Sequence, residues 1–308
     1  MNPAPGTPRN PMLRFLSVTL LFWRTYLPRV LLTKRFAIVA LGCTAPPAMA
    51  WLLLTVPRHA PEPIKGFMFP GFYLLLQFLV PLTAVITGSA VISEEVDDRT
   101  ITYLLTRPIQ RASILLGRWL ATLSILLLFV TASVTALKFV AEAKAPSWKP
   151  GAALTREWTN RDGEKRSRTV EHEFDQKLVD AMADGKLPEG LYGALLIAAL
   201  AGAAAYSALF AVIGVFTRHP MIIGLAYCFA VEGFLANLPG TSQTWTIQYY
   251  MRSYLLSRNE GLWKLLEEMP TTRFDSAAEA LTTLAVFTVL VLGSGSFGIS
   301  RKQYVLSA

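Results

Sequence analysis

The sequence contains few charged residues and few of the residues that form metal, disulfide or catalytic sites. Only 16% of its 308 residues are charged, whereas soluble globular chains carry about 25%. Its two cysteines, Cys43 and Cys228, both lie inside apolar stretches. A disulfide framework or a zinc site is therefore not indicated. Because 53% of the residues are hydrophobic, the composition predicts a membrane protein.

Nucleotide-binding and protease motifs are also missing. The chain has no G-x-x-x-x-G-K-[ST] loop for ATP phosphates and no H-E-x-x-H helix. An intramembrane serine protease would need a histidine beside a serine such as Ser294, but His59, His172 and His219 all fall in predicted loops. We therefore expect no catalytic residue, metal ligand or cofactor in this chain. Any ATP and Mg²⁺ would be bound by another polypeptide.

Six apolar stretches predict an all-α membrane protein with six transmembrane helices. Each stretch is long enough to cross a hydrocarbon core of about 30 Å. The first three spans fall within residues 36–140 and the last three within residues 191–308. The predicted spans are residues 36–56, 67–92, 119–138, 191–216, 221–238 and 277–299.

The N-terminal part of the chain precedes the first predicted span. Residues 1–12 are proline-rich and are expected to be disordered. Residues 13–35 are apolar but carry five basic residues. A spanning helix would bury Arg24 near its centre at a cost of about 2.5–3.5 kcal/mol, whereas an interfacial helix leaves the arginines at the lipid phosphates. We predict an interfacial helix on the cytoplasmic face.

Two polar insertions are predicted on the extracytoplasmic side. In residues 141–190, Asp162-Gly163 is typical of a hairpin turn, and apolar residues spaced by four from Val170 to Met182 indicate an amphipathic helix. Residues 240–275 predict two short helices, one aromatic-rich at 245–256 and one amphipathic at 262–269. Ser276 and Glu279 then form a capping-box pattern at the start of the last span.

The short loop with the highest density of charge connects the second and third spans. Residues 93–118 begin with acidic residues, continue with an apolar stripe at helical spacing and then reach Arg107-Pro108, where a helix would stop. Acids at the front of such a helix and arginines at its end match the helix dipole. From periodicity alone, a helix that merely lies on lipid headgroups fits equally well.

The order of residues in this loop resembles the cytoplasmic loop of type 2 ABC-transporter permeases. The shared order is an acid pair, a threonine, Leu-Leu, Arg-Pro, an arginine and Gly-Arg; Arg99 stands where a glycine often precedes the threonine. The resemblance implies that residues 93–113 form a coupling helix that contacts an ATPase subunit. The contact residues that it implies are Glu94, Glu95, Asp98, Arg99, Thr100, Leu104, Leu105, Arg107, Pro108 and Arg111.

The same resemblance implies an assembly and a location. The chain would be the permease of an exporter in the bacterial cytoplasmic (inner) membrane. Its partners would be two copies of a cytoplasmic ABC ATPase and a second permease copy or a homologous permease. Two alternatives stay open: a membrane scaffold that anchors a partner through residues 141–190 and, less favoured, an intramembrane enzyme.

Glu232 is the ionisable residue that lies well inside a predicted span. Acids at membrane depth are costly and frequently line a transport path. Glu232 could equally be hydrated from an outer vestibule or be paired with a cation from a loop. Gln77 in the second span could line the same path, although an interhelical hydrogen bond is the simpler role for an amide. We therefore predict Glu232 and Gln77 as candidate path residues.

The distribution of charge indicates the orientation of the spans. The net charge of +8 does not suggest a nucleic-acid partner, because no basic stripe with interleaved aromatic residues is present. With residues 93–118 inside, the cytoplasmic segments hold 13 basic and four acidic residues, and the outer segments hold 16 of each. This asymmetry follows the positive-inside rule and places both termini in the cytoplasm.

The predicted orientation can be tested by cysteine labelling of intact cells. In a variant without Cys43 and Cys228, a cysteine at Asp162 should react with a membrane-impermeant maleimide, because the 141–190 insert is expected outside. A cysteine at Gln110 should react only after the cells are opened. Labelling of the Gln110 position in intact cells would reverse the orientation.

Overall fold

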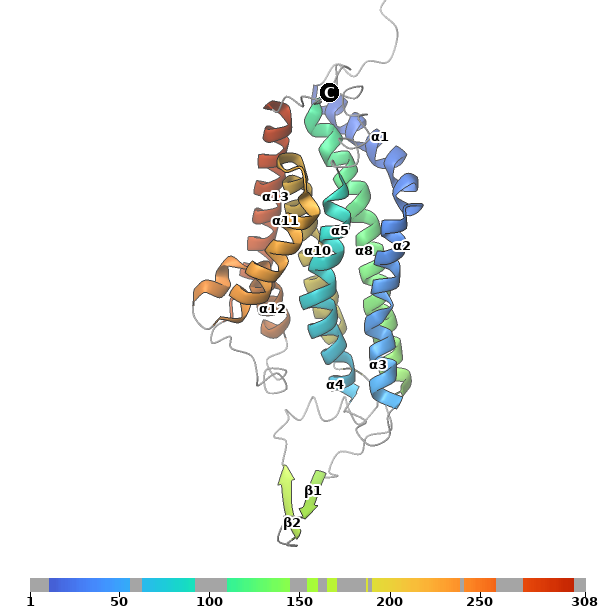
Figure 1. Ribbon diagram of the computed structural model, residues 1–308, viewed down its shortest axis with the longest axis vertical. Coiled ribbons are helices and arrows are strands. Elements are labelled where there is room, and N and C mark those ends of the chain that lie inside the picture. Colours follow the sequence, from blue (N-terminus) through green and yellow to red (C-terminus); the bar gives the residue numbers. More distant parts are fainter. Residues whose placement is uncertain are drawn as a thin grey trace, which may run out of the picture.

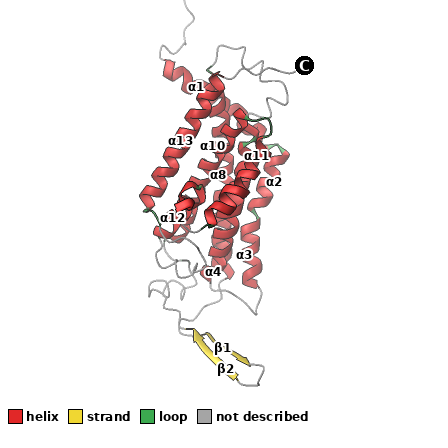
Figure 2. Ribbon diagram, turned by 60° about the vertical axis from the view of Figure 1, so that its left-hand side comes forward, coloured by secondary structure: helices red, strands yellow, loops and turns green. Residues whose placement is uncertain are grey.

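The computed structural model is a bundle of long helices with a separate two-stranded hairpin (Figure 1). The helices run roughly along the long axis of the molecule in both ribbon views (Figure 2). The structure describes residues 11–55, 63–91, 110–144, 154–159, 165–170, 187, 190–238, 241–258 and 274–301.

Five helical segments of the described chain are long and apolar enough to cross a membrane. They correspond to the first, second, third, fourth and sixth predicted spans, so the all-α membrane class is confirmed apart from the hairpin. In order, they are α2–α3 (Lys34–Cys43 and Ala45–Thr55), α4–η1–α5 (Pro63–Met68, Phe69–Leu79 and Val80–Gly88), α8 (Arg111–Lys144), α10 (Leu191–Phe216) and α13 (Ala277–Arg301).

The predicted fifth span is shorter than expected. Residues 221–238 become α11 (Pro220–Tyr227), the π-helix η2 (Cys228–Phe234) and the 3₁₀ turn η3 (Leu235–Asn237). The apolar helix Pro220–Phe234 is too short to count among the five. The helix ends at Leu238, whose backbone is extended, because a residue that precedes a proline disfavours the helical conformation.

The first and second spans are irregular. The first breaks at Thr44, whose N–H donates to the carbonyl of Leu41 at 3.1 Å, just before Pro46-Pro47. The second span is π-helical over its first half, which the apolar periodicity did not predict. Wide π-helical turns are rare and occur mostly at functional sites.

Helix α1 (Pro11–Leu31) packs against α8 near the end of the bundle where α13 finishes (Figure 1). The contact is close because Gly117 of α8 has no side chain: a Cβ there would lie 2.6 Å from the Thr19 carbonyl oxygen and 2.6 Å from Phe22 Cβ. The Trp23 indole N–H donates to Ser124 Oγ at 3.1 Å. α1 is therefore attached to the third span by both packing and hydrogen bonding.

Helix α10 forms the centre of the bundle, with contacts to α5, α8, α12 and α13. Its small residues permit close approach of the neighbouring helices. Gly202 lies against the Met251 side chain, and the Trp119 indole of α8 donates to Ser207 Oγ at 3.1 Å. These contacts hold α8 and α12 close against α10.

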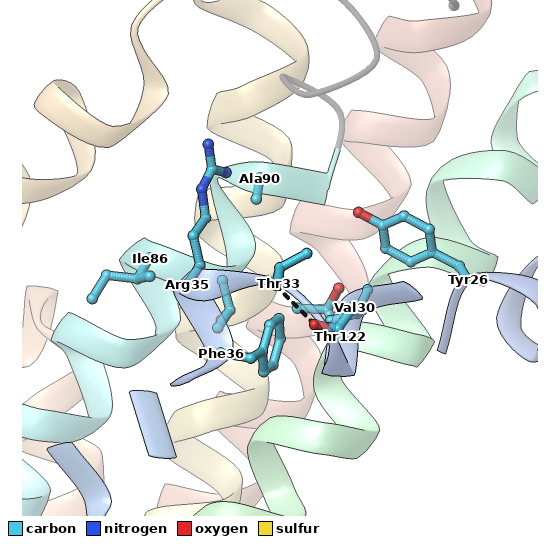
Figure 3. Close-up of a pocket in the computed structure, with 9 residues that line it drawn as sticks. Tyr26, Val30, Thr33, Arg35, Phe36, Ile86, Ala90 and Thr122 are labelled. Carbon is cyan, nitrogen blue, oxygen red and sulfur yellow. Dashed lines mark hydrogen bonds between the residues drawn. The ribbon is translucent and has the colours of Figure 1, made fainter. Parts of the chain in front are cut away.

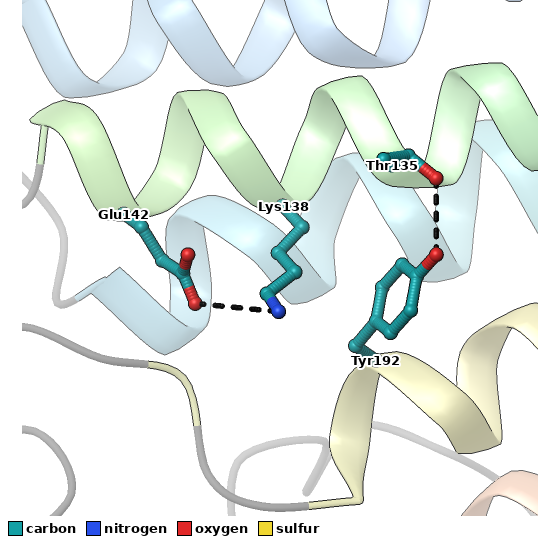
Figure 4. Close-up of polar contacts among 4 residues, drawn as sticks. All are labelled: Thr135, Lys138, Glu142 and Tyr192. Atoms are coloured by element: carbon teal, nitrogen blue, oxygen red, sulfur yellow. Dashed lines mark hydrogen bonds and ion pairs between the residues drawn. The ribbon is translucent and has the colours of Figure 1, made fainter.

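Helix α8 begins at Arg111 and extends past its predicted end to Lys144. Polar residues near its C-terminal end contact one another and α10 (Figure 4). Lys138 Nζ lies 3.9 Å from Glu142 Oε1 and 5.0 Å from the centre of the Tyr192 ring, while Tyr192 Oη hydrogen bonds with Thr135 Oγ1 at 3.0 Å. The helix therefore protrudes into the predicted 141–190 insert.

The polar insertions are helical near α13 and extended in the hairpin. One predicted helix of residues 240–275 is observed as η4 (Thr241–Trp245) and α12 (Ile247–Ser257); the second, at 262–269, lies outside the described residues. The capping box of α13 is confirmed, since the Ser276 N–H donates to Glu279 Oε2 at 3.0 Å and the Glu279 N–H donates to Ser276 Oγ at 3.3 Å.

The hairpin agrees with the turn predicted at Asp162-Gly163. β1 (Leu154–Thr159) and β2 (Lys165–Val170) are antiparallel, with Thr159 opposite Lys165. The turn residues lie outside the described chain, as do residues 171–182 of the predicted amphipathic helix; Val170, its first residue, ends β2 instead.

A matched pair of glycine substitutions tests the packing of α1 on α8. Gly117→Ala should destabilise the purified protein by about 1–3 kcal/mol, because the added methyl meets backbone and forces α1 away from α8. Gly193→Ala in α10 should be neutral or slightly stabilising, since nothing lies within 4 Å of its Cβ position and alanine favours helix. Thermal unfolding in detergent measures both; equal stability of the two variants would contradict the close contact.

Candidate functional site

The residues implied to contact an ATPase fall almost entirely outside the described chain. Residues 94–109 carry nine of them and are not described. Arg111, the tenth, is the first residue of α8. The structure therefore describes only the two flanks of this segment. One flank is the end of the second span and the other is the start of α8.

Arg118 connects these two flanks. Its side chain is 5% exposed, and its Nη1 donates to the Val91 carbonyl oxygen at 3.4 Å. Its guanidinium also lies 4.8 Å from the centre of the Tyr26 ring of α1. One buried cation of the third span therefore contacts the end of the second span and α1, directly beside the predicted coupling segment.

A small cavity lies at the corner between α1 and α2, next to this junction (Figure 3). The threonine hydroxyl groups in its wall donate to nearby backbone carbonyls: Thr33 Oγ1 to Val30 at 2.8 Å, Thr87 Oγ1 to Thr83 at 2.8 Å and Thr122 Oγ1 to Arg118 at 3.0 Å. The cavity marks the contact of α1 and α2 with α5 and α8. Its lining residues are Tyr26, Val30, Thr33, Arg35, Phe36, Ile86, Thr87, Ala90 and Thr122.

Glu232 occupies a second polar site, at the start of α12. The side chain is 1% exposed. Its Oε1 accepts from the Tyr227 hydroxyl and from the Ile247 N–H, both at 3.1 Å, and its Oε2 accepts from the Gln248 N–H at 3.1 Å. The first N–H groups of a helix have no partner within the helix and favour a negative charge. The carboxylate of η2 therefore binds the N-terminus of α12.

Gln248 brings the two candidate path residues together. Its backbone N–H binds Glu232, while its side-chain Nε2 donates to the Gln77 carbonyl oxygen at 2.8 Å. Gln77 thus takes part through its backbone in an interhelical hydrogen bond. In this conformation Glu232 is enclosed, so a role in a transport path requires α12 to move.

Arg252 completes this site on the next turn of α12. It is 3% exposed; its Nη2 donates to Gln248 Oε1 at 3.0 Å and its Nη1 to the Ala236 carbonyl at 3.2 Å. The guanidinium lies 6.0 Å from the centre of the Phe72 ring of η1. Glu232, Gln248 and Arg252 therefore form one buried chain of hydrogen bonds with opposite charges at its ends.

Sequence reasoning did not identify Gln248 or Arg252. Both lie in the aromatic-rich helix that the sequence predicts on the extracytoplasmic side. Polar residues are common in such a helix and do not by themselves indicate a site. A local signal was present in Thr246, which is a favoured N-cap residue and accepts from the Tyr249 N–H at 3.2 Å. Thr246 indicates where α12 begins, but it does not indicate that Glu232 binds this helix start.

The described residues contain no group of three His, Cys, Asp or Glu side chains that could hold a metal ion. Ser294, the serine considered for an intramembrane protease, donates its hydroxyl to the Val291 carbonyl of its own helix at 2.7 Å. The hydroxyl thus forms an ordinary intrahelical bond.

Comparison with known families identifies this arrangement of helices. Residues 36–230 match the model of a family described as ABC-2 family transporter protein, which covers more than half of the chain. The chain belongs to this family. The ABC-2 protein is thus an integral membrane protein and a membrane component of an ABC transporter, in a family that generally works with a cytoplasmic ATPase subunit. A search of curated proteins found no match.

A double-substitution cycle tests whether the charges of Glu232 and Arg252 depend on each other in this ABC-2 protein. Removing one partner of a buried charged pair costs about 3–5 kcal/mol, because the other charge is left uncompensated. Glu232→Gln and Arg252→Met should each destabilise the protein strongly, and the double variant by at least about 1 kcal/mol less than their sum.

Unfolding in mixed detergent micelles gives the required free energies. Glu279→Gln is the matched control, since Glu279 is exposed and caps α13. Its effect should add to that of Arg252→Met. Simple addition in the Glu232 cycle as well would show that the two buried charges are independent.

Proposed function

We propose that this chain is the permease subunit of an ABC exporter, moving its substrate across the bacterial cytoplasmic membrane with the ATP hydrolysis of a separate subunit. The observation that carries the proposal is the family match over residues 36–230. The coupling-like order of residues 93–113 inside the matched region supports it.

The ends of the helices support a cytoplasmic ATPase site. α5 finishes and α8 begins at the end of the bundle that also holds α1 and the last turn of α13 (Figure 1). Residues 93–113 connect α5 with α8, so their flanks lie at this end. The contacts of Arg118 with Val91 and Tyr26 would carry a displacement of that segment into three helices at once.

The finer topology is also part of the proposal. α11, η2 and η3 would complete a six-span subunit, with α12 filling the outer half of the membrane beside them. Large apolar side chains of α1, such as Leu13, Leu20 and Leu21, are exposed. This face suits an interfacial helix whose arginines lie at the headgroups.

Two such subunits would enclose the path. α2–α3 and α13 have the least buried surfaces of the five candidate spans, and apolar faces of this kind are covered by lipid or by another subunit. Two ATPase subunits would bind below the pair. Closure of these subunits around ATP favours one state only if they bind the two states with different affinity.

Paired leucine substitutions test the ATPase contact. Truncating a buried apolar anchor at an interface costs about 2 kcal/mol or more, which corresponds to roughly thirtyfold weaker binding. Leu104→Ala combined with Leu105→Ala should therefore weaken binding of the ATPase subunit by about that factor and lower the stimulated ATPase activity. Titration of the partner ATPase onto the permease in nanodiscs measures the affinity.

The matched control is Leu52→Ala combined with Leu53→Ala in α3, near the opposite end of the bundle. This variant should bind the ATPase normally. Wild-type affinity in the Leu104 and Leu105 variant would end the coupling-helix proposal and favour a helix that only lies on lipid.

A further inference from the structure

Basic residues gather at the α1–α2 turn (residues 29–35), and no acid balances them nearby in the sequence. Arg29 lies in the last turn of α1, and Lys34 and Arg35 are the first two residues of α2. Together with Arg24 they are exposed, and the first 61 residues of the chain contain no acid. Within the described part of the chain, no ion pair of Arg24, Arg29 or Lys34 is observed.

The stability of the helices does not explain two of these cations. A basic residue at the end of a helix suits the helix dipole, as Arg29 does in α1, whereas a basic residue at the start of a helix opposes it. Lys34 and Arg35 begin α2, whose first turn contains no acid and whose N-cap residue Thr33 makes no capping hydrogen bond through its side chain. The two charges therefore destabilise the start of α2 unless a negatively charged group lies near them.

Exposed apolar side chains adjoin these cations. Leu31 ends α1, and Leu32 in the turn is 89% exposed. On α2, Lys34, Ile38 and Leu41 follow one another at spacings of four and three, so they lie along one face of the helix. Ile38 and Leu41 are also exposed. A surface with cations at one end of an apolar helix face matches a molecule that has both an anionic headgroup and a hydrocarbon chain.

The α1–α2 turn lies next to the flank of the predicted coupling segment. The small cavity at this corner has Tyr26 of α1 on one side and Arg35 of α2 on the other (Figure 3). The ring of Tyr26 in turn lies 4.8 Å from the guanidinium of Arg118. A headgroup at the turn would therefore lie close to the contact that joins α1 to α8.

We propose that the α1–α2 turn is a binding site for an anionic phospholipid. The lipid phosphate contacts Arg29 and Lys34, and an acyl chain lies along the face of α2 that carries Ile38 and Leu41. A basic residue beside an anionic lipid contributes about fivefold to binding, so a zwitterionic lipid binds this site much more weakly. The inference goes beyond the proposed transport function and requires only that this ABC-2 protein lies in a membrane.

The test compares two lipids that have the same acyl chains and differ in headgroup charge. Full-length protein in neutral detergent micelles is titrated with dioleoyl-phosphatidylglycerol or dioleoyl-phosphatidylcholine, and the midpoint of thermal unfolding is recorded. A ligand that binds only the folded state raises this midpoint as its concentration passes the dissociation constant. Phosphatidylglycerol should raise the midpoint and phosphatidylcholine should raise it much less. Inorganic phosphate has no acyl chain and should leave the midpoint unchanged.

Arg29→Gln combined with Lys34→Gln should weaken the binding of phosphatidylglycerol by about twentyfold or more, because two contributions of about fivefold are lost. The matched control is Arg218→Gln combined with Arg301→Gln, which also removes two exposed cations. These lie at the same end of the bundle, where Gly298 of α13 lies against Phe216 at the end of α10. The control should keep the wild-type affinity.

Lys34→Gln alone is the second variant, in case the double variant does not fold. It should weaken the binding of phosphatidylglycerol by about fivefold. Without lipid it should not lower the unfolding midpoint, because it removes a charge that opposes the dipole of α2. A lower midpoint without lipid, together with unchanged lipid affinity, would assign Lys34 a structural role and overturn the site.

Three further outcomes overturn the proposal. An equal response to both lipids shows that headgroup charge is not recognised, and an equal loss of affinity in the control shows attraction to the overall charge of this end of the bundle. A response to inorganic phosphate shows that the turn binds a free anion. Because no ATPase subunit takes part in the titration, failure of this site leaves the proposed transport function standing, and failure of ATPase binding leaves the site standing.

Discussion

A backbone N–H or C=O that is buried without a partner costs several kcal/mol. The part of this bundle around α12 depends on meeting that requirement for a short helix that begins among long ones. The start of α12 is buried among spanning helices, and Glu232 and Thr246 supply acceptors for its first N–H groups. Without them, a helix terminus in this place would be unstable. The buried carboxylate of Glu232 thus explains how the start of α12 can lie in this place.

The same arrangement, a buried arginine that donates to a backbone carbonyl beside an aromatic ring, occurs at two places in the bundle. Beside α1, Arg118 donates to the carbonyl of Val91 and lies over Tyr26. Beside η2 and η3, Arg252 donates to the carbonyl of Ala236 and lies near Phe72. In each case a guanidinium satisfies a carbonyl where a helical segment finishes, and an aromatic face covers the cation. Each arginine therefore holds several helices together at a place where the chain leaves its regular path.

The second span links these two places. Its first half provides Phe72 and the Gln77 carbonyl to the α12 site, and its end provides the Val91 carbonyl to Arg118. In this ABC-2 family membrane component, one helix thus contacts both the flank of the predicted ATPase-binding segment and the polar site at the start of α12. A continuous packed helix is the kind of physical connection through which two sites can be coupled.

Local chemistry in the sequence was sufficient for the membrane class, because a bilayer of fixed thickness requires apolar runs of matching length. The predicted bounds of α10 agree with the structure, and the capping box at Ser276 and the hairpin around Asp162 were predicted for the same local reason. The short fifth helix, the π-helical turns and the partners of Glu232 were not. Gln77 and Gln248 are separated by 171 residues in the chain, and periodicity within one helix carries no information about which carbonyl or N–H a distant helix will present. Those pairings arise only when the helices pack and each buried polar group must find an acceptor or donor among the groups that packing brings near.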